Sequence, residues 1–292
     1  MLLLTGATSP VGQALLRRLT AAREPVRCLV RDPRRLGSDR VRVQIVLGDL
    51  ADPPSFRNAL RGVRTVVHLA AAIRDQPAGS IEELNGIATW RMVQAAERAG
   101  VEHFVFMSSL GAASHDRTRF LRAKALAERA VLGSDIRRTV VAPSLIYAPG
   151  DPLTTLLERI AALSPLVPLS GSGHARFAPI WADDVGAAIA AILGDAGDGR
   201  DRYELAGPDV LSQRAVAELV LRAAGRTRRL VNVPAPVVSR CLRIVEMLLT
   251  TRAPLTWDEA ELLEVSMVAA RGTADAESLG VQPHRMQAIL AA

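Results

Sequence analysis

The sequence contains very little lysine. Lysine and arginine together make up 36 of its 292 residues, yet a single one of them, Lys124, is lysine, and the other 35 are arginine. Arginine stays protonated in proteins, whereas a lysine ammonium shifts its pKa readily when it is buried. The position of this one lysine is therefore informative about function.

Cysteine is scarce, and long apolar runs are missing. Cys28 and Cys241 lie far apart and show no metal-ligand spacing, so we interpret them as buried thiols in a reducing compartment and expect no metal site. No stretch approaches the roughly 18 consecutive apolar residues that a spanning helix needs. The N-terminus lacks the basic and long apolar regions of a signal peptide. We therefore expect a cytoplasmic protein without a transmembrane segment.

The composition is that of a globular protein. Hydrophobic residues make up 49% of the chain and charged residues 23%, with a formal net charge of +6. The acidic residues are interspersed with the basic ones, whereas nucleic-acid binding normally needs basic residues clustered on one face. We therefore expect no nucleic-acid partner. The length allows one large domain or two unequal ones.

Strand and helix patterns alternate through the first half of the chain. Short apolar runs, typical of buried parallel strands, are separated by segments with helical spacing of apolar residues. The expected strands are 2–5, 26–30, 41–47, 63–69, 103–107 and 138–142, and the expected helices are 10–23, 54–60, 81–99 and 119–132. This alternation predicts an α/β fold, a doubly wound parallel Rossmann sheet with helices on both faces.

The regular alternation fades after about Pro149. We expect further helices at 183–193, 212–224 and 234–250, and a short strand at 202–205. The segment 234–250 carries a broad apolar face with charged residues opposite. Such a face favours packing on a core over a role at a partner or membrane interface.

A glycine-containing loop joins the first expected strand to the first expected helix. It reads Gly6-Ala-Thr-Ser-Pro-Val-Gly12, and a strand–helix–strand unit is complete by Val30. In this context backbone amides and the positive end of a helix cradle a pyrophosphate. The candidate cofactor-binding residues here are Thr5, Gly6, Thr8, Ser9, Val11 and Gly12. Ser9 replaces the central glycine of the pattern, for which we expect a modest penalty but no loss of binding.

The end of the second expected strand indicates which dinucleotide is bound. Asp32 lies 20 residues after Gly12, where an acidic residue binds the ribose 2′-hydroxyl of NAD, whereas arginine there accommodates the 2′-phosphate of NADP. Arg31 precedes Asp32, and Arg34 and Arg35 follow it. We expect NADP(H) to be favoured, with NAD(H) as the alternative. The competing interpretation is that these arginines are solvated surface charges.

Further motifs match one superfamily along the whole chain. They are Gly48-Asp-Leu-Ala-Asp52, Val67-His-Leu-Ala-Ala71, the helix from Asn85, Phe104-Val-Phe-Met-Ser-Ser109, Phe120-Leu-Arg-Ala-Lys124, Pro143-Ser-Leu-Ile-Tyr-Ala-Pro-Gly-Asp151, Asp183-Asp-Val185 and Tyr203-Glu-Leu-Ala-Gly-Pro208. With the glycine loop, they resemble the atypical extended short-chain dehydrogenase/reductase superfamily. The chain is most similar to the branch that holds the nucleotide-binding accessory subunit of respiratory complex I and the NmrA-like redox-sensor proteins.

The resemblance implies a domain organisation and a set of site residues. It implies a Rossmann domain over 1–164, with 178–206 returning to it, and a smaller substrate-binding part over 165–292. Asp49 and Leu50 would contact adenine, Ala70 and Ala71 would line the cofactor beside the nicotinamide, and Pro143 and Lys124 would complete the cofactor site. Ser109 would polarise a substrate carbonyl. A tyrosine four residues before the lysine is the general acid/base in this superfamily.

The catalytic pair is incomplete in this chain. Residues at i and i+4 share a helix face, so the lysine ammonium can bind the ribose while it lowers the pKa of the tyrosine. Phe120 stands at the tyrosine position and has no hydroxyl, whereas Lys124 is retained. His115, Tyr147 or Lys124 itself are the alternative proton donors.

Two functions stay open at this point. The missing hydroxyl favours an NAD(P)(H)-binding protein without efficient turnover, acting as a redox sensor or as a subunit of an assembly with a protein partner. The alternative is an active NADP-dependent oxidoreductase that uses a replacement proton donor on a small carbonyl or alcohol substrate.

Overall fold

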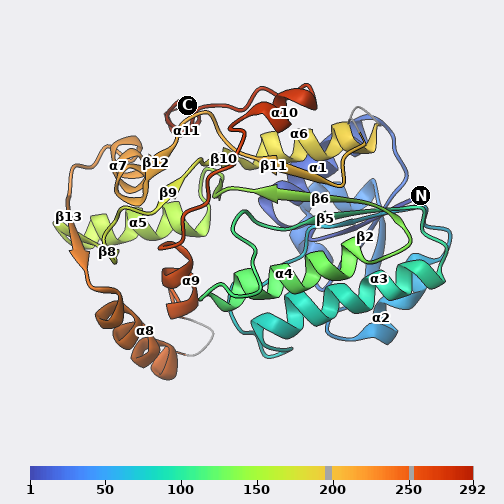
Figure 1. The fold of residues 1–292 in the computed structure, drawn as a ribbon, viewed down its shortest axis with the longest axis horizontal. Helices are drawn as coiled ribbons and strands as arrows, with labels where there is room; N and C mark the ends of the chain where they lie inside the picture. The colour runs from blue at the N-terminus through green and yellow to red at the C-terminus, as the bar shows by residue number, and fades with distance from the viewer. Residues whose placement is uncertain (195–198, 250–252, 292) are drawn as a thin grey trace.

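A parallel β-sheet forms the centre of the computed structural model, which describes residues 1–194, 199–249 and 253–291 (Figure 1). From these residues the main sheet takes seven strands in the order β11-β6-β5-β4-β1-β2-β3, each parallel to its neighbours. The strands are β1 (Leu2–Thr5), β2 (Val26–Val30), β3 (Gln44–Leu47), β4 (Thr65–His68), β5 (His103–Met107), β6 (Arg137–Pro143) and β11 (Arg202–Leu205). This strand order is that of a Rossmann fold, so the predicted fold class is confirmed.

Helices cover both faces of this sheet (Figure 1). On one face α1 and α6 pack against each other, and their apolar residues join those of the strands in one core. On the other face α2, α3 and α4 enclose a second core. These helices are α1 (Pro10–Ala21), α2 (Pro53–Arg57, continued by the short η2, Asn58–Leu60), α3 (Ala88–Arg98), α4 (Arg119–Leu132) and α6 (Ala182–Leu193).

Short polar residues fix where several helices begin. The Ser9 hydroxyl caps α1 by accepting a hydrogen bond from the Gly12 amide at 3.0 Å, and Pro10 fills the first helical position, where its missing amide costs nothing. Thr118 caps α4 in the same way. The expected helix over 81–99 is not uniform, because a π-helical turn, η3 (Glu83–Ile87), precedes α3. Such turns occur frequently at functional sites.

The remaining elements lie beside the main sheet (Figure 1). They comprise three strand pairs, β7 (Ile146–Tyr147) with β10 (Ile180–Trp181), β8 (Leu166–Ser170) with β13 (Arg229–Val233) and β9 (Arg176–Phe177) with β12 (Leu211–Ser212), and the helices α5 (Pro152–Leu163), α7 (Gln213–Ala223), α8 (Ala235–Leu249), α9 (Trp257–Leu262), α10 (Ala274–Ser278) and α11 (Met286–Leu290). Helices α5 and α7 share a core with β8. Helix α10 returns to the main sheet, where Ala276 and Leu279 join the core of α1 and α6.

Helix α8 does not pack on a core, so that expectation from the sequence is wrong. Its described side chains include the exposed residues Val237, Ile244, Met247 and Leu248, and none of the described ones is fully buried. Its neighbour is the short helix α9, which covers one side of α8 and leaves the rest of the apolar face in solvent. Thr250, the last residue of the expected helix, lies outside the described residues.

The two cysteines differ in environment. Cys28 lies buried in β2, and burial raises the pKa of its thiol to about 12. Cys241 is exposed on α8, so the expectation that both thiols are buried is wrong for it, for the same reason that α8 itself is exposed. Within the described ranges no helix is long and apolar enough to cross a membrane. The expected compartment stays a prediction.

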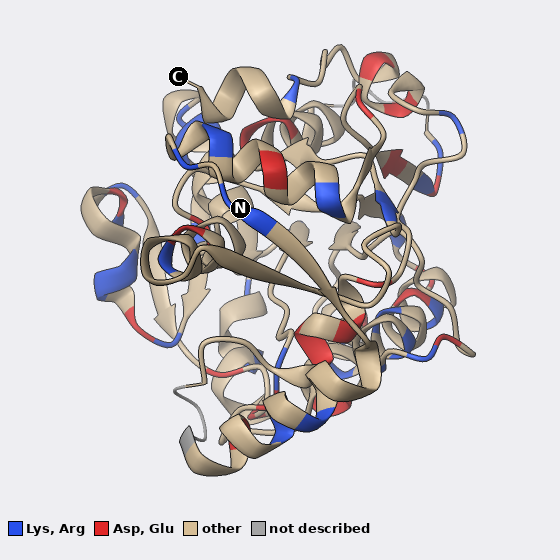
Figure 2. Cartoon of the chain, turned by 90° about the vertical axis from the view of Figure 1, so that its left-hand side faces the viewer, with Lys and Arg blue, Asp and Glu red and all other residues tan. Residues whose placement is uncertain are grey.

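Charged residues of both signs are interspersed over the face of the molecule in Figure 2. Many of the arginines are paired with acidic residues. Arg17 and Arg18 on α1 both contact Asp183 at the start of α6, and Arg64 contacts Glu102. The high arginine content therefore contributes to mixed surface networks.

Candidate functional site

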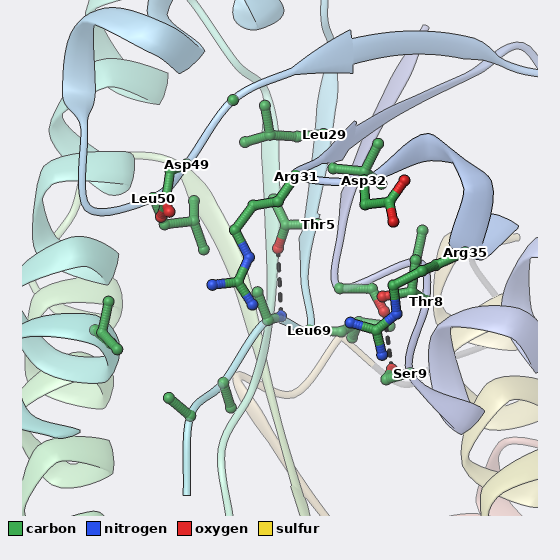
Figure 3. Close-up of a pocket in the computed structure, with 18 of the residues that line it drawn as sticks. Thr5, Thr8, Ser9, Leu29, Arg31, Asp32, Arg35, Asp49, Leu50 and Leu69 are labelled. Atoms are coloured by element: carbon green, nitrogen blue, oxygen red, sulfur yellow. Dashed lines mark hydrogen bonds between the residues drawn. The ribbon is translucent and has the colours of Figure 1, made fainter. Parts of the chain in front are cut away.

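A pocket of about 620 Å³ lies at the carboxyl ends of β1, β2 and β4. The loop between β1 and α1, the residues after β2, the turn after β3 and the segment after β4 form its walls (Figure 3). The expected site residues that line it are Thr5, Gly6, Thr8, Ser9, Arg31, Arg35, Asp49, Leu50, Ala70 and Ala71. In open α/β sheets, ligands bind where the strand order reverses, as it does here between β1 and β4.

Close backbone contacts explain the two glycines of the loop. Gly6 has a φ of +72°, and a Cβ at this residue would lie 2.6 Å from the Ala70 amide nitrogen. A Cβ at Gly12 would lie 2.2 Å from the Gly6 carbonyl oxygen. Gly6 therefore permits the tight turn, and Gly12 permits α1 to approach it. The loop leaves a cradle beside the start of a helix, which fits a pyrophosphate.

Ser9, which replaces the central glycine, has a structural role in the loop. Its hydroxyl donates a hydrogen bond to the Gly6 carbonyl at 2.8 Å and accepts one from the Gly12 amide at 3.0 Å. These bonds hold the turn and cap α1 at the same time. The substitution is therefore accommodated by a hydrogen-bonded loop.

The residues after β2 place charge at the pocket. Arg31 and Arg35 line it, and Figure 3 shows the Arg35 side chain on the side of Thr8 and Ser9 and the Arg31 side chain extending toward the side of Leu50. Asp32 also lines the pocket, but its Oδ1 accepts a hydrogen bond from the Arg34 amide at 3.0 Å and caps η1 (Pro33–Val41). The Asp32 carboxylate is thus engaged in holding this turn, whereas two guanidinium groups face the pocket.

A buried hydrogen-bond chain lies under the pocket. Thr89 donates to the Asn85 carbonyl at 2.6 Å, so the 3.1 Å contact of its hydroxyl with His68 Nε2 requires a hydrogen on that nitrogen. His68 Nδ1 then accepts from the Thr5 hydroxyl at 2.9 Å, and Thr5 accepts from the Ala70 amide at 3.3 Å. Burial, with a smaller contribution from the nearby Lys124, lowers the pKa of His68 to about 3. A neutral imidazole therefore ties together the ends of β1 and β4.

Asn85 anchors the segment that follows β4. It lies buried in the π-helical turn η3. Its side-chain oxygen accepts from the Ala72 amide at 3.0 Å, and its side-chain nitrogen donates to the carbonyls of Ala72 and Ile81 at 2.7 and 2.8 Å. Asn85 therefore fixes the backbone next to Ala70 and Ala71, which form one wall of the pocket.

Lys124 lies behind the wall of the pocket. Its side chain is 2% exposed, and its ammonium donates to the Met107 carbonyl at 2.8 Å. It lies 4.9 Å from the ring centre of Phe106 and 5.6 Å from that of Phe120. Burial lowers the pKa of Lys124 to about 7, against the opposing effect of Glu128. Met107 does line the pocket, so the lysine supports one of the pocket residues.

Some expected site residues lie outside the pocket that the described residues form. These are Val11, Gly12, Arg34, Lys124 and Pro143 from the expected cofactor set, and Ser109 and Phe120 from the expected catalytic set. The alternative proton donors also lie outside it. His115 is exposed in its loop, and Tyr147 is buried with its pKa raised by desolvation.

Met267 covers Ser109. Its sulfur lies 3.9 Å from the Ser109 hydroxyl, and the two residues are 5% and 8% exposed. The Met267 amide donates to the Arg176 carbonyl at 2.8 Å, and the Met267 carbonyl accepts from the Ser144 hydroxyl at 2.6 Å. Met267 shares an apolar cluster with Phe120. The C-terminal segment therefore closes the place where a substrate carbonyl would meet Ser109.

Sequence reasoning missed several of these residues. Gln76 and Met107 line the pocket, and His68 supports it. His68 contacts Thr5, which lies 63 residues earlier in the sequence, and Met267 contacts Ser109, which lies 158 residues earlier. The motif Val67-His-Leu-Ala-Ala71 and the helix from Asn85 indicate this region in the sequence. Which of their residues contact one another depends on the fold.

The fold and the pocket together define a dinucleotide-binding protein of the Rossmann class. Residues 6–196 match the NAD(P)H-binding family, and the chain belongs to that family. Its cofactor is therefore a nicotinamide dinucleotide.

Two similar proteins support the resemblance seen in the sequence. The chain is 28% identical over 280 residues to the mitochondrial NADH dehydrogenase [ubiquinone] 1 alpha subcomplex subunit 9 of Arabidopsis thaliana, covering 92% of this chain and 68% of that protein. It is 30% identical over 240 residues to an NAD(P)H azoreductase of Xenophilus azovorans, covering 80% and 77%. The resemblance to the complex I accessory subunit is confirmed. The NmrA-like part of the resemblance stays a prediction.

A solved structure confirms the fold. A nucleoside-diphosphate-sugar epimerase from Staphylococcus aureus superposes with a TM-score of 0.79 at 20% identity, covering 100% of this chain and 99% of that one. At this identity the similarity shows a shared fold.

Proposed function

We propose that this protein holds NADP(H) without ordinary reductase turnover, as a redox sensor or as a subunit of a larger assembly. The observation that carries this proposal is the state of the catalytic positions. Ser109 is covered by Met267, and Phe120 supplies no hydroxyl. The similarity to a complex I accessory subunit supports the same conclusion.

The dinucleotide would be held by the residues that line the pocket. The loop after β1 and the positive end of α1 suit the pyrophosphate, Asp49 and Leu50 suit the adenine, and Ala70 and Ala71 suit the nicotinamide side. When bound, NAD(P)H supplies a hydride donor. Lys124 contributes by fixing Met107, whose carbonyl it binds at 2.8 Å.

The preference for NADP(H) rests on charge at the end of β2. Arg31 and Arg35 line the pocket, while the Asp32 carboxylate caps the next turn. Arginine binds a phosphate through charge-assisted, multidentate hydrogen bonds. A 2′-phosphate at this position would therefore be bound more strongly than a 2′-hydroxyl.

One observation favours the alternative of an active oxidoreductase on a small carbonyl or alcohol substrate. The named azoreductase relative is consistent with this alternative.

Titration of the purified protein with NADPH and NADH, followed by assay with a panel of small carbonyl compounds, tests the proposal. We expect both dinucleotides to bind, NADPH more tightly, and NADPH consumption far below the ~1–10³ s⁻¹ of ordinary enzymes. Turnover at ordinary rates would establish the oxidoreductase instead. Absence of binding to either dinucleotide would contradict both functions.

A further inference from the structure

Gln76 contacts Arg31 across the pocket. The Arg31 Nη1 donates to the Gln76 side-chain oxygen at 2.7 Å, and both residues line the pocket. Arg31 follows β2, whereas Gln76 belongs to the segment after β4, 45 residues later. The contact therefore joins two walls that are separate in the sequence.

The backbone around Gln76 is held in place from two sides. Gln76 and Gly79 exchange two backbone hydrogen bonds of 3.0 Å, which close a tight turn. The preceding Asp75 accepts from the Ile81 amide at 2.8 Å and pairs with Arg119 at 3.0 Å. Arg74 pairs with Glu259 at 2.8 Å. Gln76 thus presents its amide oxygen to Arg31 from a fixed position.

We propose that Gln76 determines dinucleotide specificity by holding Arg31 in position for the 2′-phosphate of NADP(H). The inference rests on the proposed function. The guanidinium group has five N–H donors, and one contact to Gln76 leaves donors for a phosphate. Holding a long side chain in its binding geometry reduces the entropy that binding must overcome.

The neutrality of the amide is central to this role. An amide oxygen orients the guanidinium and leaves its charge uncompensated. A carboxylate at the same place would form a charged pair with Arg31, which would compensate the guanidinium charge and hold the group away from the 2′-phosphate. The replacement Gln76→Glu is nearly isosteric, so it separates the effect of charge from that of shape.

The test measures the dissociation constants of NADPH and NADH for the full chain carrying Gln76→Glu. We expect NADPH binding to weaken by roughly tenfold or more, because a charge-assisted contact is lost, while NADH binding changes little. Ala78→Glu is the matched control, because Ala78 is exposed in the same turn and is not among the described pocket residues. Ala78→Glu adds the same charge and should leave the ratio of the NADPH and NADH dissociation constants near that of the wild type.

A second variant separates a specific role from a general electrostatic effect. In an Arg31→Met background, Gln76→Glu should change the ratio of the NADPH and NADH dissociation constants by less than about twofold. The two residues are coupled, so the effect of one substitution depends on the presence of the other side chain. An unchanged ratio in Gln76→Glu, or an effect that persists without Arg31, would overturn the role of Gln76. A wild-type preference for NADH would also overturn it. Failure of the wild type to bind either dinucleotide would instead refute the proposed function itself.

Discussion

The ammonium of Lys124 lies 5.6 Å from the centre of the Phe120 ring, one helical turn away on α4. The i, i+4 spacing of the two residues therefore places both side chains on one face of α4. Both side chains are buried, and the Phe120 ring carries no hydroxyl. The structure retains the lysine as a buried support for Met107.

Replacement of Lys124 should change how stability depends on pH. Burial lowers its pKa from 10.5 to about 7, so between pH 7 and 9 the unfolded chain binds more protons at this group than the folded chain. Stability at this site therefore rises with pH, by up to ~1.4 kcal/mol per pH unit. The variant Lys124→Met should lack this rise, as measured by urea unfolding at pH 7, 8 and 9. Equal slopes in the two proteins would show that the lysine is not desolvated.

His68 should make the protein sensitive to acid. Its folded pKa of about 3 lies below its ordinary value of 6.5, so in this interval the unfolded state binds the extra proton. Stability is therefore lost as pH falls from 6.5 toward 3, by up to ~1.4 kcal/mol per pH unit. Comparison with His68→Gln, which keeps polar atoms and does not titrate, isolates this contribution. The difference in unfolding free energy between the two proteins should shrink steadily from pH 6.5 to pH 4, and a constant difference would refute the buried neutral imidazole.

Restoring the hydroxyl should not by itself restore catalysis. In Phe120→Tyr the sulfur of Met267 still covers Ser109, so we expect no more NADPH consumption with carbonyl substrates than in the wild type. Adding Met267→Ala opens this place and should allow measurable turnover, at a stability cost of about 2–5 kcal/mol.

The control for this pair is Met286→Ala in the Phe120→Tyr background. Met286 is also buried, at 3% exposure, but it belongs to the core of α5 and α7. It should cause a similar loss of stability and no gain of turnover. Ordinary turnover in Phe120→Tyr alone would contradict the closure by Met267.

The sequence predicted the elements whose limits are set locally. Leu2–Thr5 ends at a glycine turn, and α4 begins at its Thr118 cap, so apolar periodicity and capping residues sufficed. The strand expected from Val41 begins only at Gln44, because two short helical turns, separated by the non-helical Gly37, occupy Pro33–Val41.

The features that could not be predicted depend on contacts between segments that are distant in the sequence. The position of Met267 over Ser109 and the exposure of α8 depend on how the C-terminal half docks. The link between Gln76 and Arg31 depends on how the segments after β2 and β4 meet. A pattern within one segment carries no information about such contacts. The two glycines of the loop could be recognised because the tight turn and the close approach of α1 require them.

Calorimetric titration with NADPH of the wild type, Thr8→Glu and Thr8→Gln tests whether this pocket binds a dinucleotide. Thr8 lines the pocket and is partly exposed beside the start of α1. A carboxylate there repels a pyrophosphate, yet near a helix N-terminus it does not destabilise the fold. We predict one NADPH per wild-type chain, similar binding in Thr8→Gln, and binding weakened by roughly tenfold or more in Thr8→Glu with no fall in melting temperature. Absence of wild-type binding, or equal affinity in Thr8→Glu, would contradict a dinucleotide in this pocket.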